Sequence, residues 1–340
     1  MIQSLISKLV RGENLEETEA VEMMRKIMTG NATDAQIAGF ITALRMKGET
    51  VEEIAGCARV MREYATKVTP GRRPLIDTCG TGGDGSKTFN ISTTAAFVVA
   101  GCGLAVAKHG NRSISSQCGS ADVLEALGVN LNLSPEQVAQ CIDEVGIGFL
   151  FAPYLHGAMK YAVGPRRELG IRTIFNVLGP LTNPANAEIQ LLGVFDPNLT
   201  RPLGEVLKRL GVKQALVVHG HGHLDEISLS GPTQVTEVTP AGCRDFTLTP
   251  EDLGLDPLPL EEILGGDPQT NAEICEKVLQ GQPGAHRNIV LANAAAALVA
   301  AGMASDFRTG VSLASESIDS GRAYEKLHGL RRMSNLLAAS

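Results

Sequence analysis

LIDTCGTGGDGSKTFNISTT, residues 75–94, sets the fold class of this chain of 340 residues. The quoted stretch opens with a short apolar run, Leu75–Cys79, that is typical of a buried strand, and closes on the start of a helical run, Ser92–Ala100. Between them, four glycines fall within the six residues GTGGDG. Loop amides and a helix N-terminus together bind anions, so this succession favours an α/β domain with a phosphate site.

Two known phosphate-binding templates fit the glycine-rich loop only in part. The glycine spacing matches the dinucleotide pattern G-x-G-x-x-G, but no Asp or Glu that could bind a ribose occurs between Asp84 and Asp122. The Walker pattern requires Gly-Lys-Ser/Thr, whereas this chain reads GSKT at 85–88. The loop therefore predicts a phosphate cradle of another kind, with a plain flexible turn as the alternative.

The rest of the chain divides into a helical part and an α/β part. Capping boxes predict helix starts after Asn14, Thr33 and Thr50, and the segment PGRRP at 70–74 ends the helical pattern. Further along, predicted strands and helices alternate: strands at Leu104–Lys108, Ile189–Phe195 and Ala215–His219, and helices at Ala121–Leu127, Thr200–Leu210 and Asn288–Met303. We expect an all-helical domain over 1–72 and a larger α/β domain over 73–340, with a mostly parallel sheet flanked by helices.

Composition excludes several classes of protein. The formal net charge of −7 argues against a nucleic-acid surface. Seven scattered cysteines without a C-x-x-C pair argue against a disulfide framework or a cysteine zinc site, and favour a reducing compartment. The N-terminus lacks the apolar core of a signal peptide, and the longest apolar run, Ala95–Ala107, is too short to span a bilayer. We expect a soluble, cytoplasmic protein without a membrane partner.

Polar clusters follow two of the predicted strands. KHGNRSISS at 108–116 combines two cations, an amide and hydroxyls, which suits a polyanionic ligand, although a solvated loop is the alternative. The adjacent carboxylates Asp225 and Glu226 suit a hard cation that also takes phosphate oxygens, with an acidic turn as the alternative. His219, His221 and His223 alternate with glycine, which leaves open a zinc site or a loop lining the cation site.

Several long motifs resemble the anthranilate phosphoribosyltransferase family. They are the GTGGD core within 77–94, KHGNRS at 108–113, GSADVLEALG at 119–128, GPRRELGIRTIFNVLGPLTNPA at 164–185 and LDEIS at 224–228. The resemblance implies a magnesium-dependent enzyme of tryptophan biosynthesis, usually a homodimer, with the fold of the pyrimidine nucleoside phosphorylases. In that fold, chain around 163–186 returns to the helical domain. Many relatives carry Lys-Ser where this chain has Gln117 and Cys118.

The resemblance also implies site residues. The phosphoribosyl pyrophosphate (PRPP) site maps onto Gly80, Gly83, Asp84, Thr88, Asn90, Ile91, Ser92, Thr93, Lys108, His109, Gly110, Asn111, Arg112, Ser113, Ile114, Ser115, Ser116 and Ser120. The magnesium ligands map onto Ser92, Asp225 and Glu226, and the anthranilate site onto Gly80, Asn111, His156 and Arg166.

These residues predict a displacement of diphosphate from ribose C1 by the aromatic amine. Arg166, at an expected helix start after Gly164-Pro165, presents a planar fork that matches the anthranilate carboxylate. His109 is the candidate proton acceptor. Two rival functions stay open at this point: a pyrimidine nucleoside phosphorylase of the same fold, and a non-catalytic relative that binds nucleic acid.

Overall fold

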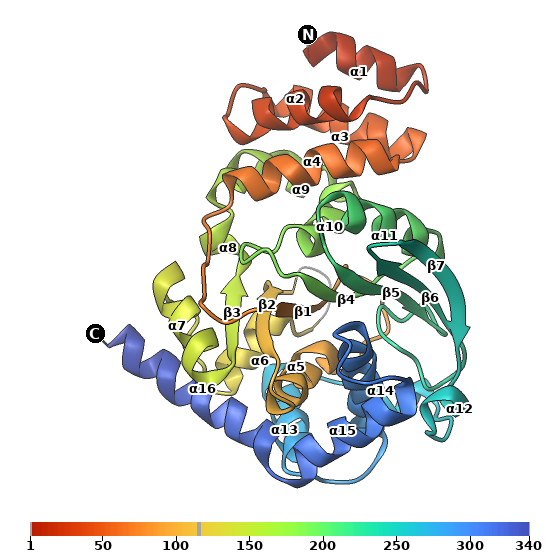
Figure 1. Ribbon diagram of the computed structural model, residues 1–340. Coiled ribbons are helices and arrows are strands. Elements are labelled where there is room, and N and C mark those ends of the chain that lie inside the picture. The colour runs from red at the N-terminus through yellow and green to blue at the C-terminus, as the bar shows by residue number, and fades with distance from the viewer. Residues whose placement is uncertain (1, 114–116, 340) are drawn as a thin grey trace.

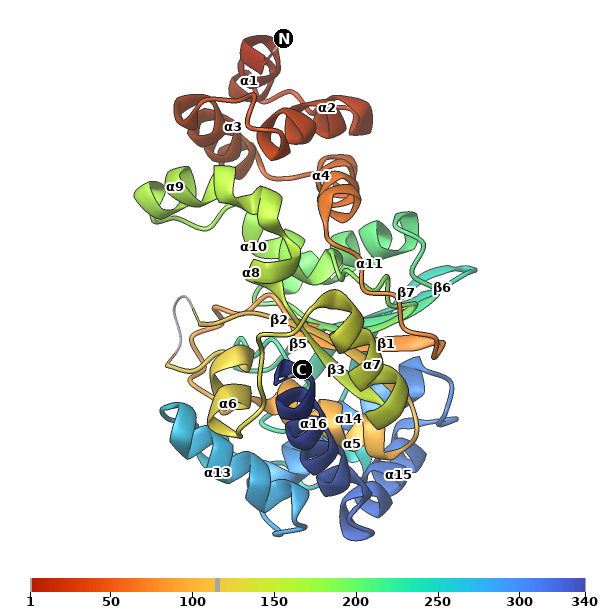
Figure 2. The ribbon, with the colours of Figure 1, turned by 90° about the vertical axis from the view of Figure 1, so that its left-hand side faces the viewer.

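The computed structural model describes residues 2–113 and 117–339. Four helices form the N-terminal part: α1 (Ile2–Val10), α2 (Glu17–Met28), α3 (Asp34–Lys47) and α4 (Val51–Tyr64). Helix α9 (Lys160–Leu169), from the middle of the chain, packs against α2 and α3, and Figure 2 shows it beside them, away from the sheet. The chain between 160 and 186 thus passes through the helical part before it returns to the sheet.

A seven-stranded mixed sheet forms the centre of the larger part (Figure 1). The strand order is β3-β2-β1-β4-β5-β6-β7; the first five strands are parallel and the last two antiparallel. The strands are β1 (Leu75–Gly80), β2 (Ala105–Gly110), β3 (Ile147–Phe151), β4 (Ile189–Gly193), β5 (Gln214–Gly220), β6 (Thr233–Thr239) and β7 (Gly242–Leu248). The predicted mostly parallel sheet beside a helical domain is confirmed.

Helices cover both faces of the sheet. One face carries α5 (Ile91–Gly101) with the C-terminal helices, and the other carries α11 (Thr200–Arg209) and the helical part (Figure 1). The remaining helices are α6 (Ser120–Ala126), α7 (Pro135–Val145), α8 (Ala152–Leu155), α10 (Phe175–Leu178), α12 (Pro250–Leu253), α13 (Pro268–Leu279), α14 (Ala285–Ala300), α15 (Phe307–Asp319) and α16 (Arg322–Ala338). In the part of the chain that is described, no helix is both long and apolar enough to cross a membrane.

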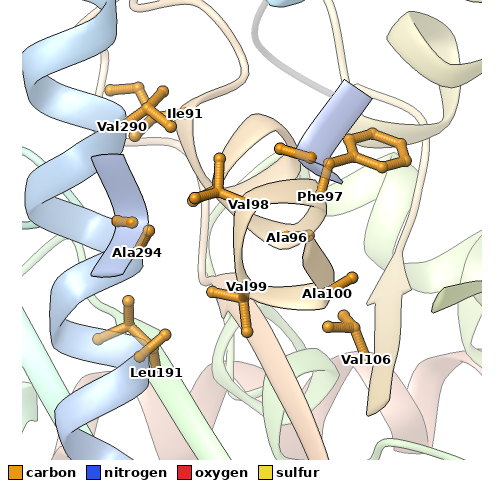
Figure 3. Close-up of a cluster of buried hydrophobic side chains, with 14 of the residues drawn as sticks. Ile91, Ala96, Phe97, Val98, Val99, Ala100, Val106, Leu191, Val290 and Ala294 are labelled. Atoms are coloured by element: carbon orange, nitrogen blue, oxygen red, sulfur yellow. The ribbon is translucent and has the colours of Figure 1, made fainter. Parts of the chain in front are cut away.

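Two large hydrophobic clusters lie on opposite faces of the sheet. Successive residues of a strand point to opposite faces, so Leu216 of β5 joins one cluster and Val217 the other. Helix α5 is buried on nearly all sides, in agreement with its predominantly apolar sequence. Figure 3 shows Val98 and Val99 of this helix in the cluster that also holds Leu191 and Ala294. This packing fixes α5, whose N-terminus follows the glycine-rich loop that leaves the carboxyl end of β1.

Two predicted helix starts are wrong. Helix α2 begins after Glu16 and not after Asn14, because the Asn14 side chain accepts a hydrogen bond from Lys47 Nζ at 3.0 Å and is not available as a cap. Helix α9 begins at Lys160 and continues through Pro165, so Arg166 lies in its last turn and not in its first. The helix follows directly on the 3₁₀ turn Gly157–Met159, so its first residue is Lys160 and Pro165 lies inside it.

Candidate functional site

The candidate site lies at the carboxyl edge of the parallel strands, where the strand order reverses. Strands β2 and β3 lie on one side of β1, and β4 and β5 on the other. Ligands of open α/β sheets bind at such a switch point, outside the carboxyl ends of the strands. The loops that follow β1, β2 and β5 carry the three polar clusters that were singled out in the sequence.

Asp225 connects the loop after β5 to the glycine-rich loop after β1. Its Oδ2 accepts a hydrogen bond from the Gly82 N–H at 2.7 Å. A Cβ atom at Gly80 would meet the Asp225 carboxylate, and one at Gly193, at the end of β4, would overlap the Asp225 carbonyl oxygen. Both strand ends carry glycine because Asp225 lies too close to each of them for a side chain.

Glu226 lies at the N-terminus of α5. Its Oε1 accepts a hydrogen bond from the Ser92 N–H at 3.0 Å, and the Ser92 side chain also bonds to this carboxylate. The helix N-terminus favours negative charge at this position. In the same first turn of α5, the buried Thr93 Oγ1 has no hydrogen-bond partner among the described residues. An anionic oxygen at this N-terminus would supply the missing partner.

Three carboxylates make the region around the loop strongly acidic. The Asp225 N–H lies 3.5 Å from Asp84 Oδ2, and Asp84 also accepts a hydrogen bond from Ser86 Oγ at 2.6 Å. Burial and the charge of Asp84 raise the pKa of Asp225 to about 7, and burial and the charge of Asp225 raise the pKa of Glu226 to about 8. A divalent cation would relieve this repulsion, and hard oxygen donors are the ligands that Mg²⁺ prefers.

The donor set fits a cation that is shared with a ligand. Within residues 2–113 and 117–339, no three His, Cys, Asp or Glu side chains converge as a closed metal site. Mg²⁺ is usually held by one or two carboxylates together with phosphate oxygens, so an open pair of this kind is sufficient. The zinc alternative loses support, because His219 Nδ1 lies 2.8 Å from the Val194 carbonyl and its ring centroid is 6.1 Å from that of His223.

The cluster after β2 is only partly free to bind an anion. Lys108 is buried and donates to the Thr78 carbonyl at 2.5 Å. Arg112 is held by ion pairs with Asp122 at 3.0 Å and Glu125 at 2.5 Å. The predicted residues Ile114, Ser115 and Ser116 lie outside the described residues, whereas Ser120 is near, with its Oγ 3.2 Å from the Asn111 carbonyl.

His109 of β2 and His156, directly after α8, form a buried pair. Their Nε2 atoms are 3.2 Å apart, and the His109 ring also bonds to the Gly179 backbone. Burial lowers the pKa of His109 to about 3 and that of His156 to about 4. Both rings are therefore neutral at physiological pH.

Arg166 and Arg172 lie on the segment that returns from the helical part. The Arg166 guanidinium lies 5.0 Å from the Phe175 ring centroid and is half-buried, and among the described residues it pairs with no carboxylate. Arg172 stacks on Phe195 at 4.1 Å and donates to the Gly83 carbonyl. An unpaired, partly desolvated Arg fork is suited to a carboxylate ligand.

Sequence reasoning missed two residues that hold the glycine-rich loop. One is Arg172, described above; it lies within the motif at 164–185, but its partner is a backbone carbonyl, which the motif does not identify. The other is Asn271 of α13, which donates to Asn90 Oδ1 at 3.0 Å and accepts from the Gly266 N–H at 2.8 Å. The glycine pair at 265–266 was the available signal for this second contact.

Comparisons with known proteins agree with this geometry. Residues 3–65 match the helical bundle domain of the glycosyl transferase family, and residues 72–324 match its α/β domain. The chain is 57% identical over 338 residues to the anthranilate phosphoribosyltransferase of Symbiobacterium thermophilum, covering 99% of both chains. It is also 57% identical to that of Moorella thermoacetica over 330 residues, covering 97% of both.

This chain belongs to the anthranilate phosphoribosyltransferase family. The Thermus thermophilus anthranilate phosphoribosyltransferase structure superposes with a TM-score of 0.92 at 47% identity, covering 97% of this chain and 99% of that one. The Saccharomyces cerevisiae anthranilate phosphoribosyltransferase, in complex with PRPP and Mg, gives a TM-score of 0.91 at 29% identity, covering 99% and 98%. Another structure of the yeast enzyme is in complex with 4-fluoroanthranilate. The resemblance seen in the sequence is confirmed, and with it the transferase function in tryptophan biosynthesis.

Proposed function

We propose that this anthranilate phosphoribosyltransferase binds PRPP and Mg²⁺ at the carboxyl edge of β1, β4 and β5, and anthranilate between the His109–His156 pair and Arg166. One observation carries the proposal: Asp225 and Glu226 converge on the amides of Gly82 and Ser92, which joins an acidic pair to a phosphate cradle. The complex of the yeast enzyme with PRPP and Mg supports the same pairing of ligands.

In this proposal the diphosphate and the ribose phosphate lie over the loops after β1 and β2. The amides of the glycine-rich loop and of the α5 N-terminus would donate to phosphate oxygens, and Lys108 would add a buried positive charge. The individual residues within 80–93 and 108–120 that the family resemblance assigned to PRPP are also assigned to PRPP in this proposal. Arg112 would have to exchange its bonds to Asp122 and Glu125 for bonds to phosphate.

Mg²⁺ would be held by Asp225 and Glu226, with Ser92 beside them, and when bound it stabilises negative charge on the leaving diphosphate. The carboxylates repel one another in its absence, so their raised pKa values are the expected property of an open cation site. Gly80 and Gly193 allow Asp225 to approach both strand ends, which sets the position of the pair.

Anthranilate would be oriented by its carboxylate, bound by the planar fork of Arg166, with Gly80, Asn111 and His156 near the ring. Its amine attacks C1 of the ribose, the bond from C1 to the diphosphate oxygen breaks, and the electron pair leaves with diphosphate. The cationic secondary amine formed in this way is a strong acid, so the weakly basic, neutral His109 is sufficient as a proton acceptor. The larger contribution to the rate comes from holding the two substrates close together in the orientation that the reaction requires.

Loss of anthranilate fluorescence on addition of PRPP and Mg²⁺ tests the proposal. We expect EDTA to abolish the loss and Asp225→Asn to raise the Mg²⁺ concentration that gives half-maximal rate by about tenfold or more, since one ionised ligand is removed. Asp256→Asn, at an exposed position, is the matched control. A normal Mg²⁺ dependence in Asp225→Asn would place the cation elsewhere. A phosphorolysis assay with pyrimidine nucleosides covers the nearest rival activity.

We also propose a cytoplasmic homodimer that uses the outer face of the helical part. Four large apolar side chains on the packed helices α1, α3 and α9 are exposed: Val10, Met46, Tyr161 and Val163. A subunit contact would remove such side chains from water. Light scattering on the protein and on a Val10→Lys/Met46→Lys variant would test the contact.

Free thiols at all seven cysteines support a reducing compartment.

A further inference from the structure

The pairing of β1 with β2 stops early, although both strands continue. These strands pair at two positions, Leu75 with Ala105 and Ile76 with Val106. By contrast, β1 pairs with β4 at five positions from Ile76 to Gly80, and β2 pairs with β3 at five positions from Val106 to Gly110. The hydrogen-bond ladder between β1 and β2 is therefore interrupted over the last four residues of each strand, immediately below the two phosphate loops, although the two strands stay neighbours in the sheet; we call this interruption the split.

Side chains satisfy the backbone groups that the split leaves without ladder partners. Asp77 Oδ1 accepts a hydrogen bond from the His109 N–H at 3.1 Å. Asn183 Nδ2 donates to the Ala107 carbonyl at 2.8 Å, and Lys108 Nζ donates to the Thr78 carbonyl at 2.5 Å. One backbone donor and two backbone acceptors along the gap are thus paired with side chains from β1, from β2 and from the segment that precedes β4.

The same side chains are bound to one another and buried. Asn183 Nδ2 also donates to Asp77 Oδ2 at 2.8 Å, and Asn183 Oδ1 accepts from the Ala185 N–H at 2.8 Å. Asp77, Asn183 and Lys108 are 0%, 2% and 3% exposed. Burial raises the pKa of Asp77 to about 6, whereas the charge of Lys108 opposes that shift. A continuous ladder would satisfy the same backbone groups without burying a carboxylate and an ammonium, so the split is expensive to maintain.

The split has a geometric consequence for the site. Strand β1 leads into the glycine-rich loop, and β2 leads into the Asn111–Arg112 loop. In a continuous ladder, backbone hydrogen bonds would fix the ends of β1 and β2 relative to each other. Here the side chains of Asp77, Lys108 and Asn183 fix them instead, so these side chains set where the two loops start.

We propose that Asp77 and Asn183 form a wedge that takes the place of the ladder between the ends of β1 and β2 and so sets the relative position of the two loops that bind the sugar-phosphate substrate. They are positioning residues: Asp77 holds the backbone of His109 and faces the charge of Lys108, and Asn183 ties the wedge to the segment that returns from the helical part. The inference rests on the PRPP site proposed above and extends it to two residues that the family resemblance did not assign.

Steady-state kinetics with PRPP as the varied substrate test the wedge. Asp77→Asn keeps an oxygen for the His109 N–H but removes the charge, and Asn183→Ala removes both donated hydrogen bonds. We expect each to lower kcat/KM for PRPP by about tenfold or more, which corresponds to about 1.4 kcal/mol. The control is Ser317→Ala, which removes an equally buried hydrogen bond, to the Val98 carbonyl at 2.9 Å, from α15. We expect a similar change in Tm for the control, with kcat/KM within about twofold of the parent protein.

Amide hydrogen exchange of β2 provides a second measurement that does not depend on turnover. We expect Asn183→Ala and Asp77→Ala to expose the His109 amide to exchange, while the Val106 amide, which bonds to the Gly146 carbonyl, stays protected. Protection of His109 in both variants would overturn the wedge. If Asp77→Asn and Asn183→Ala changed kcat/KM for PRPP no more than Ser317→Ala does at a similar change in Tm, the wedge would have no role in the site. If the parent protein neither binds PRPP nor turns over, the proposed site fails, and the exchange result still decides whether the wedge exists.

Discussion

The Nε2 atoms of His109 and His156 lie 3.2 Å apart in a buried contact between β2 and the turn after α8. At this distance one ring must donate and the other accept, because two protonated nitrogens would repel. Because burial keeps both rings neutral at physiological pH, the two histidines form one neutral hydrogen-bonded unit.

This pair predicts a loss of stability in acid. The folded pKa values of about 3 and about 4 lie below the ordinary value of about 6.5, so the unfolded chain binds protons first as the pH falls. Above pH ~6.5 both states are neutral and the pair has no effect on the pH dependence. At pH ~5 each histidine lowers the free energy of unfolding by about 2 kcal/mol.

Urea unfolding of the parent protein and of His156→Gln at pH 8 and pH 5 checks this prediction. Other groups titrate in the same range, so the quantity to compare is the difference between the two proteins. We expect His156→Gln to lose less stability than the parent protein between the two pH values. Equal losses would show that His156 accepts a proton in the folded state as readily as in the unfolded one.

Arg166 and its neighbour Arg167 provide a matched pair for the anthranilate site. Arg166 is half-buried over Phe175, whereas Arg167 is exposed. A hydrogen bond to a charged group contributes about 1.5–3 kcal/mol, so we expect Arg166→Ala to raise KM for anthranilate by about 10- to 150-fold. KM for PRPP should stay within about twofold, and Arg166→Lys should restore only part of the loss. An equal effect of Arg167→Ala would argue against a specific carboxylate site.

Gly193 is predicted to control the cation site without carrying a functional group. A Cβ atom there would overlap the Asp225 carbonyl oxygen, and Gly193 sits within β4, where the backbone cannot move freely. We expect Gly193→Ala to displace Asp225 and to raise the Mg²⁺ requirement of the fluorescence assay. Gly39→Ala is the control, because its Cβ would make ordinary contacts with Ile6 at 3.8 Å. An unchanged Mg²⁺ requirement would mean that Asp225 does not set it.

Glu53 is predicted to be a main contributor to the stability of the helical part. Its buried carboxylate accepts hydrogen bonds from the Leu15 and Thr50 amides at 2.9 and 2.8 Å, and from Lys47 Nζ at 2.9 Å. Removing one partner of a buried ion pair costs about 3–5 kcal/mol, which is the loss that we expect for Glu53→Ala in urea unfolding. Glu63→Ala breaks an exposed pair with Arg25 and should cost at most about 1 kcal/mol. Comparable losses would contradict the assignment.

Much of the architecture could be predicted from local sequence. Capping boxes at Thr33 and Thr50 start helices as predicted, because a cap needs only residues three positions apart. Where a long-range partner competes, the local signal failed: Asn14 bonds to Lys47 and does not cap α2. The candidate site could be listed from motifs, because each motif is a loop that directly follows a strand.

The amino-acid sequence by itself determined the helical and α/β parts, the strands that lead into the polar loops, and the family. Tertiary structure alone decided how these loops meet. It brought Asp225 against Gly82, paired Arg112 with carboxylates and left Arg166 without a carboxylate partner among the residues that the structure describes. It also replaced part of the ladder between β1 and β2 with side-chain hydrogen bonds, among them the contact between Asp77 and Asn183, which are 106 positions apart. Such contacts depend on packing across the sheet, which no short-range periodicity or motif encodes.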